Sequence, residues 1–312
     1  MSVNGGWPDL TELERTARSV RREILTMLHQ AGSGHPGGSL SEVELLLGLY
    51  GYALRHDPQH PTWPQRDRFV LSKGHGCPAL YVVLSHYGYF PKTELATLRR
   101  YGSRLQGHPQ LGLPGLEIAS GSLGQGISVA LGMALAGRLD PSTSSGSSSD
   151  GSRAESSPST VLRTQSRAQA EGSRGGAGYR VWCLVGDGEC DEGQVWEAAM
   201  AAAHHRVENF HVIVDANGVQ QNGPTRQVMN SEPLVEKWRA FGWDAREING
   251  HSVREVLQAY DAVRKITGQP SVIVARTVKG KGVSFMEGKP AWHGVAPNTE
   301  QLGAALAEIG ED

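Results

Sequence analysis

The sequence predicts an α/β protein, a three-layer α/β/α arrangement around a mostly parallel, doubly wound sheet. The first observation is a pair of apolar runs, "YRVWCLV" and "FHVIVDA", separated by a helical segment, which is the pattern of a βαβ unit with a right-handed crossover. The second is that residues 245–282 repeat the order of strand, helix and strand. The third is that no second apolar core is evident, so residues 1–312 are expected to form a single domain.

The segments before this unit alternate between helices and glycine-rich breaks. Apolar positions at helical spacing predict an amphipathic helix over residues 10–31, which the break "GSGHPGG" ends. A second helix is expected from about Ser39, where Ser41 to Glu44 resembles a capping box. Farther on, "DRFVLSKGHG" predicts a short strand with a glycine turn and "CPALYVVLSHYGYF" a buried helix. "GSLGQGISVALGMALAG" predicts a small-residue loop that leads into a helix of glycine and alanine.

Residues 140–178 differ in composition from the rest of the chain. They are dominated by Ser, Gly, Arg and Ala and contain almost no bulky apolar side chain. Such a segment buries too little surface to offset the entropy of ordering it. We interpret it as a mobile surface insertion within the domain, with a partner-docking or regulatory loop as the alternative.

The composition excludes several classes of protein. The net charge of −2 gives no indication of nucleic acid or of an anionic membrane as a partner. Three cysteines (Cys77, Cys183 and Cys190) form no CxxC pair, which favours a reducing cytoplasm over a disulfide framework. The N-terminal stretch has no apolar core of a signal peptide, and no apolar run is long enough to predict a membrane span.

Acidic and amide side chains follow two neighbouring strands at the points where the strands end. Asp187 follows the strand "YRVWCLV", and Asn217 follows the next strand. Ligands of open parallel sheets bind at this edge, and carboxylate and amide oxygens suit Mg²⁺ or Ca²⁺ better than zinc. A helix N-terminus beside them favours a phosphate. Glu189 and Asp191 are interpreted as first-turn residues of the following helix.

Beyond these strand ends, the run "GDGECDEGQVWEAAMAAAHHRVENFHVIVDANG" resembles the thiamine diphosphate motif. The chain as a whole resembles the N-terminal, diphosphate-binding part of transketolase. Seven segments match in the family's order and span residues 32–298: "GSGHPGG", "DRFVLSKGHG", "GHPQ", "GSLGQG", "GDGECDEG", "DANGVQ" and "WHGVAPN". The resemblance implies a diphosphate- and metal-binding domain over residues 1–312.

The resemblance also implies roles for individual residues. Asp187, Asn217 and the backbone carbonyl of Val219 would bind the metal, and Gly188 would contact the diphosphate. Asn217 would also belong to the cofactor site. The turn Gly121, Ser122 and Leu123 would line the cofactor, with Ser122 a departure from the proline that is common there. Glu192 matches a glutamate that links the two cofactor sites across the dimer.

Four histidines fall in matching segments. The resemblance implies that His75 and His293 reach the diphosphate, that His35 and His108 hold the substrate, and that His293 also faces the substrate. Imidazoles suit sugar hydroxyls and phosphate oxygens. Lys73, beside "GHG", is interpreted either as a phosphate contact or as a solvated side chain. The basic stretch 278–282 is expected to be a loop near the mouth of the cofactor site.

The resemblance implies reversible two-carbon ketol transfer from a ketose phosphate to an aldose phosphate, as in pentose phosphate metabolism. The family's activating glutamate lies on a pyrimidine-binding domain, and this sequence offers no candidate for it. We therefore expect a partner subunit that carries the pyrimidine-binding and C-terminal domains, and a heterotetramer of two such pairs.

Two alternatives stay open. One is a thiamine diphosphate-dependent component that acts on 2-oxo acids or transfers a hydroxyacyl unit in specialised metabolism. The other is a non-catalytic regulatory subunit. A nucleotide-binding Rossmann protein is excluded because no G-x-G-x-x-G follows the first strand of a βαβ unit.

Overall fold

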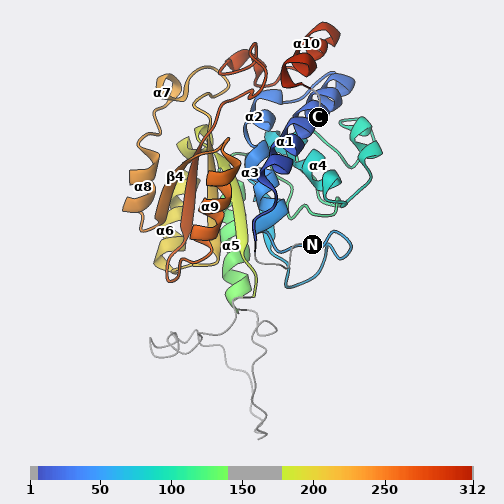
Figure 1. Cartoon of the computed structure of the whole chain (residues 1–312). Helices are drawn as coiled ribbons and strands as arrows, with labels where there is room; N and C mark the ends of the chain where they lie inside the picture. The colour runs from blue at the N-terminus through green and yellow to red at the C-terminus, as the bar shows by residue number, and fades with distance from the viewer. Residues whose placement is uncertain (1–5, 140–177, 311–312) are drawn as a thin grey trace, which may run out of the picture.

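The computed structural model describes residues 6–139 and 178–310. Within them, five strands form one sheet in the order β1-β2-β3-β5-β4, and every neighbouring pair is parallel (Figure 1). The strands are β1 (Arg68–Leu71), β2 (Val181–Gly186), β3 (Phe210–Ala216), β4 (Asp244–Asn249) and β5 (Ser271–Arg276). The predicted parallel sheet is confirmed.

Helices cover both faces of this sheet. The helices of the described residues are α1 (Leu10–Ala31), α2 (Pro36–Ser41), α3 (Val43–Gly48), α4 (Cys77–His86), α5 (Gln125–Leu139), α6 (Gly193–His204), α7 (Thr225–Val228), α8 (Leu234–Ala240), α9 (Val253–Val263) and α10 (Thr299–Ile309). A π-helical turn (Leu49–Ala53) follows α3, and 3₁₀ turns occupy Gly74–Gly76, Lys92–Thr97, Gly188–Asp191 and Pro290–Trp292. The long helix predicted over residues 10–31 is confirmed with those bounds.

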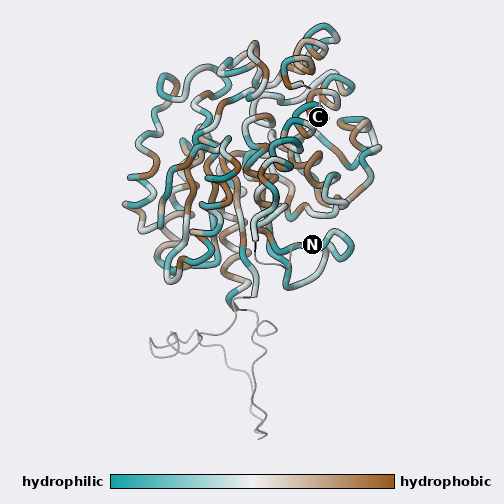
Figure 2. The backbone as a smooth tube through the Cα atoms, in the orientation of Figure 1, coloured by the Kyte–Doolittle hydropathy of each residue, from teal (hydrophilic) through white to brown (hydrophobic). Residues whose placement is uncertain are grey.

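Apolar side chains of the strands alternate between two cores. Trp182, Leu184 and Ile213 pack with α1, α3, α4 and α9 on one face, whereas Cys183 and Val212 pack with α5, α6 and α8 on the other. Figure 2 shows the hydrophobic segments gathered in the sheet and in the helices against it. Because both faces are covered, β2 and β3 are continuously buried, as in other parallel sheets. The three-layer α/β/α architecture is therefore confirmed.

The second helix begins earlier than the sequence predicts. α2 starts at Pro36, whose fixed backbone angle suits the first helical position, rather than near Ser39. The expected capping box does not form, since the Ser41 hydroxyl instead donates to the Asp215 carboxylate at 2.6 Å. A local pattern was therefore overridden by a buried tertiary contact.

Most of the segment interpreted as an insertion, residues 140–177, lies outside the described residues, so that interpretation stays a prediction. In the described part of the chain, no helix is long and apolar enough to cross a membrane.

Candidate functional site

The carboxyl ends of β2 and β3 meet at one edge of the sheet and place Asp187 there. Its side chain is 5% exposed. Oδ1 accepts the Gly188 amide at 2.9 Å, and Oδ2 accepts the Gly218 amide at 2.8 Å and the Thr225 hydroxyl at 3.1 Å. Burial, reinforced by the nearby Asp215 carboxylate, raises the pKa of Asp187. A carboxylate so placed is stabilised by a cation.

Asn217 and Val219 bring two further oxygens to the same edge. Asn217 Nδ2 donates to Asp215 Oδ2 at 3.2 Å, and Asn217 Oδ1 accepts the Val219 amide at 3.1 Å. These contacts fix which way the carboxamide points. Asp187, Asn217 and Val219 line one cavity of about 320 Å³.

The other residues of this cavity come both from the same turns and from distant parts of the chain. Of the predicted site residues, the lining also includes His75, Leu123, Gly188, Glu192 and His293. The carboxylate, carboxamide and carbonyl oxygens form the hard donor set that Mg²⁺ or Ca²⁺ takes in proteins. The residues present therefore fit a divalent cation that is shared with an anionic group.

Lys279 is a cavity residue that the sequence did not single out. Its side chain is 2% exposed, and Nζ lies 3.0 Å from the Val219 carbonyl and 2.8 Å from His293 Nδ1. Burial, with the charge of Lys73 as the next cause, lowers the pKa of Lys279 to about 8. The signal in the sequence was the basic stretch 278–282, and in the structure Gly280, with a φ of 80°, turns the chain directly after this lysine. The predicted basic loop 278–282 therefore places the Lys279 ammonium group inside the cavity.

The four predicted histidines gather into one cluster. The His35 ring centroid lies 5.5 Å from those of His75 and His293 and 5.8 Å from that of His108, and His75 and His293 are 5.1 Å apart. Burial is the largest cause that lowers their pKa values, to about 4 for His35 and His293. The rings are therefore neutral at pH 7, and each offers one donor and one acceptor nitrogen. Their roles toward cofactor and substrate stay predictions.

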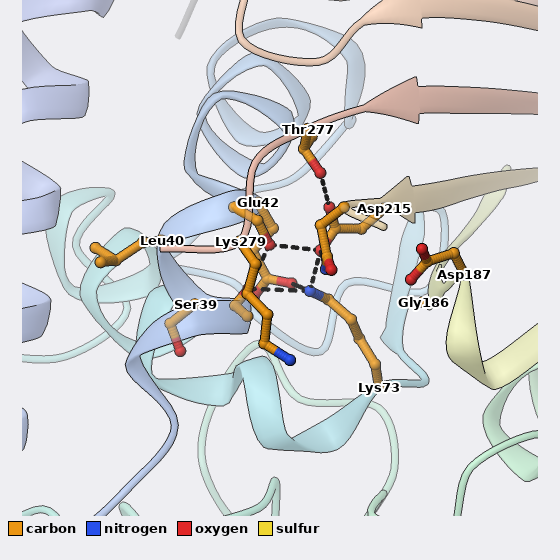
Figure 3. Close-up of polar contacts among 12 residues, drawn as sticks. Ser39, Leu40, Glu42, Lys73, Gly186, Asp187, Asp215, Thr277 and Lys279 are labelled. Atoms are coloured by element: carbon orange, nitrogen blue, oxygen red, sulfur yellow. Dashed lines mark hydrogen bonds and ion pairs between the residues drawn. The ribbon is translucent and has the colours of Figure 1, made fainter. Parts of the chain in front are cut away.

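A buried charge cluster of Glu42, Lys73 and Asp215 lies near Asp187 (Figure 3). Lys73, 1% exposed, is paired with Glu42 at 2.7 Å and with Asp215, and it donates to the Gly38 carbonyl at 3.0 Å. The interpretation of Lys73 as a solvated side chain is therefore wrong. Burial raises the pKa of Glu42 to about 8, although Lys73 acts in the opposite direction. The cluster joins α2, β1 and β3 beneath the cavity.

Glu189 also differs from its interpretation as a helix first-turn residue. It lies in the 3₁₀ turn Gly188–Asp191, is 2% exposed, and accepts hydrogen bonds from the Ser72 hydroxyl, the Gly124 amide and the Gly186 amide. Three donors on one carboxylate replace the water that it lost on burial. Asp191 is exposed, as a helix-end residue would be, and accepts from Gln220 Nε2 at 2.7 Å.

The remaining predicted residues lie at the border of the cavity. Glu192 is exposed at the start of α6 with no side-chain cap, so its link across a dimer stays a prediction. Gly121 and Ser122 line an adjoining hollow of about 230 Å³ together with Val129. A Cβ at position 121 would lie 3.2 Å from the His108 ring, which places the predicted turn beside the histidine cluster.

Comparison with known proteins shows the family of the chain. The model of the transketolase thiamine diphosphate binding domain matches residues 13–150 and 164–312. The chain is 40% identical, over 301 residues and 96% of both chains, to the 6-deoxy-6-sulfo-D-fructose transketolase subunit of a Clostridium species. It is 35% identical to one subunit of the apulose-4-phosphate transketolase of Phocaeicola vulgatus, over 96% of this chain and 94% of that one.

Longer transketolases match as well. The human enzyme is 35% identical over 91% of this chain and 40% of its own length. The crystal structure of the Campylobacter jejuni transketolase matches with a TM-score of 0.82 and 30% identity, over 98% of this chain and 44% of that chain. The chain therefore spans less than half of these longer relatives.

Proposed function

The chain belongs to the transketolase family, whose thiamine diphosphate binding domain it carries, and from this premise we propose that it is the N-terminal subunit of a two-subunit transketolase. It is a thiamine diphosphate-dependent transferase that acts as one subunit. The proposed reaction is reversible transfer of a two-carbon ketol unit between sugars. The observation that carries this proposal is the cavity in which Asp187, Asn217 and Val219 meet Lys279 and two histidines.

In this proposal, separate residues bind the metal ion, the diphosphate and the substrate. Asp187, Asn217 and the Val219 carbonyl hold Mg²⁺ or Ca²⁺, and Lys279, His75, His293 and the Gly188 backbone contact the diphosphate. When bound, the cofactor supplies the carbon nucleophile and the electron sink. His35 and His108, neutral at pH 7, orient the sugar hydroxyls by hydrogen bonds, and His293 lies between both sets.

A partner supplies the rest of the proposed enzyme. The chain matches about 40% of the length of the human enzyme, and the relatives named as subunits match it almost end to end. We propose that the partner carries the pyrimidine-binding domain with the activating glutamate and that two pairs assemble as a heterotetramer. Because two named relatives act on sugars that carry a sulfonate or a phosphate, we propose a substrate of that anionic class.

Replacing Asp187 tests the site assignment. Asp187→Ala removes the charged metal ligand, so we expect the reconstituted complex to lose at least about two orders of magnitude in affinity for thiamine diphosphate with Mg²⁺, since each factor of ten is only 1.4 kcal/mol. Titration calorimetry on the complex measures this. Asp244→Asn is the matched control, because Asp244 pairs with Arg246 on the edge strand. Unchanged cofactor affinity in Asp187→Ala would contradict the assignment.

Substrate assays separate the proposal from its alternatives. The complex is expected to turn over ketose and aldose pairs but not 2-oxo acids with a carrier, because four neutral histidines suit polyols. A regulatory subunit would keep full turnover after Asp187→Ala. Turnover of 2-oxo acids with a carrier, or full turnover by the Asp187→Ala complex, would reject ketol transfer by this site.

A further inference from the structure

The turns that follow β4 and β5 lie against each other at the carboxyl edge of the sheet. The two strands are parallel neighbours, so their carboxyl ends share this edge. A Cβ at Gly250 would lie 2.5 Å from Thr277 Cγ2, so the close approach of the two turns requires a glycine there. This approach brings His251 beside Val278, the residue directly before Lys279.

The His251 side chain holds the start of the loop 278–282 by a hydrogen bond. Its Nε2 lies 2.8 Å from the Val278 amide nitrogen, and its Nδ1 lies 3.0 Å from Glu44 Oε2. A backbone N–H only donates, so Nε2 is the acceptor and carries no hydrogen. Nδ1 therefore carries the hydrogen of the ring and donates it to Glu44.

Two further buried side chains fix this tautomer. Glu44 on α3 also accepts from Arg21 Nη2 at 2.7 Å, and these two side chains are 8% and 7% exposed. Burial opposes ionisation of Glu44, but the charge of Arg21 and the hydrogen bond from His251 outweigh it and lower the pKa of Glu44 to about 2. A carboxylate can only accept, which agrees with donation by the ring. Arg21 also packs against the far end of the loop, since a Cβ at Gly282 would lie 3.2 Å from its Cδ.

The loop fixed in this way carries Lys279 into the cavity. In the part of the chain that the structure describes, the hydrogen-bond partners of its ammonium group are neutral: the Val219 and Gln220 carbonyls and His293 Nδ1. Neutral acceptors hold a cation less strongly than a carboxylate does. The position of the ammonium group therefore depends on the backbone of the loop.

We propose that His251 is a positioning residue, which holds the loop 278–282 at its first amide and so keeps the Lys279 ammonium group in the cofactor cavity. Arg21 and Glu44 keep the His251 ring in the tautomer that accepts this hydrogen bond. None of the three lines the cavity, so they act on it only through the loop. The inference rests on the proposed contact between Lys279 and the diphosphate and extends the site to residues outside the cavity.

Acylation of lysines in the reconstituted complex, without cofactor, tests this role. The side chain of His251→Asn is too short to reach the Val278 amide. Because a buried donor without a partner costs about tenfold in the population of the closed loop, we expect N-hydroxysuccinimidyl acetate to modify Lys279 faster by that factor. Modification of Lys73, whose charged partners lie outside the loop, is expected to keep its wild-type rate. Mass spectrometry of the two lysine peptides measures both rates.

A longer amide side chain serves as the rescuing variant. His251→Gln can place its amide oxygen where Nε2 accepts the hydrogen bond, so we expect it to expose Lys279 less than His251→Asn does. His204→Asn, exposed at the end of α6, is the control and is expected to behave as wild type. Equal increases for Lys279 and Lys73 in His251→Asn would indicate general loosening and overturn the proposal. An unchanged rate for Lys279, or equal rates in the Asn and Gln variants, would also overturn it.

A measurement on the wild-type complex does not depend on how a variant folds. In nitrogen NMR spectra of the histidine rings, His251 is expected to show the neutral tautomer with its hydrogen on Nδ1, and His251→Gln assigns the signal by removing it. A hydrogen on Nε2 would exclude the hydrogen bond from the Val278 amide and reject the positioning role.

Calorimetric titration with thiamine diphosphate and Mg²⁺ separates this inference from the proposed function. We expect His251→Asn to bind the cofactor about tenfold more weakly, which corresponds to one lost contact of ordinary strength. If Lys279 became selectively reactive while cofactor affinity kept its wild-type value, the positioning role would stand and the proposed diphosphate contact of Lys279 would fail. If affinity fell without selective reactivity of Lys279, the positioning role would be rejected.

Discussion

Single residues show where sequence reasoning succeeds and where it cannot. Asp187, Asn217 and the four histidines stand in short glycine-flanked segments whose spacing already predicts a shared edge of the sheet, and the structure brings them together. Lys73 and Glu189 gave no such signal, because their partners are far away in the chain: Asp215 for Lys73 and Gly124 for Glu189. Burial of a charge depends on those distant partners, so local pattern does not reveal it.

The buried ion pair of Lys73 gives a prediction on stability. Lys73→Met leaves the buried Asp215 carboxylate without its cation and Glu42 without its partner, and removing one partner of a buried pair costs about 3–5 kcal/mol. Urea unfolding at pH 7 measures the loss in free energy of unfolding. Arg104→Gln is the control, because the exposed pair Arg104–Glu94 is worth less than about 1 kcal/mol. A loss for Lys73→Met as small as that of the control would contradict the prediction.

His35 gives a prediction on pH. Its pKa in the folded chain is about 4, below the value of 6.5 for a free side chain, so the unfolded chain binds more protons between these values. Stability should therefore fall as the pH drops from 6.5 toward 4. His35→Asn removes this contribution, and its unfolding free energy should decline less steeply than that of the wild type between pH 7 and pH 5. If the unfolding free energy, measured by urea unfolding, fell by the same amount between pH 7 and pH 5 in both proteins, this assignment would be rejected.

At the scale of elements, strands and long helices were easier to predict than the turns that carry the site. Continuous apolar runs identify β2 and β3, and helical spacing identifies α1 with its bounds. The 3₁₀ turns at Gly74–Gly76 and Gly188–Asp191 were not foreseen as separate elements. Their geometry comes from contacts such as the Glu189 hydrogen bonds, which no periodicity encodes.

Glu189 gives a prediction for these turns. Its carboxylate joins the end of β1 through Ser72, the end of β2 through Gly186, and the turn at Gly124. Glu189→Gln places an NH₂ group against a backbone N–H, and leaving a buried donor unpaired costs about 1–3 kcal/mol. We expect a lower Tm and weaker thiamine diphosphate binding, because Leu123 in the adjoining turn lines the cavity. Differential scanning calorimetry and calorimetric titration check both, and a variant with wild-type values in both would refute this role.

At the scale of the whole molecule, the sequence predicted the three-layer fold because each strand–helix–strand unit leaves few topologies. It did not reveal where other chains would dock, since exposure depends on the final packing. The exposed side chains of Val129 on α5 and Met200 on α6 are large and apolar. Val129 borders the hollow beside Gly121 and Ser122, where the proposed partner has to complete the cofactor site.

The position of Val129 gives a prediction on assembly with the partner subunit. Val129→Glu puts a charge on the proposed contact face, and we expect at least tenfold weaker association with the partner subunit while the Tm of the isolated chain stays unchanged. Light scattering after size exclusion measures the association. Leu139→Glu, at the far end of the same helix, serves as the control because its side chain is already 80% exposed. Undiminished association of Val129→Glu would place the interface elsewhere.

The burial of Lys73 and Lys279 means that the two amines are shielded from bulk reagents in the native state. An amine-reactive acylating reagent should modify the exposed lysines within minutes and reach these two only when the sheet edge opens. Mass spectrometry of the time course would then report how often the cavity opens to solvent and whether cofactor binding makes this opening rarer.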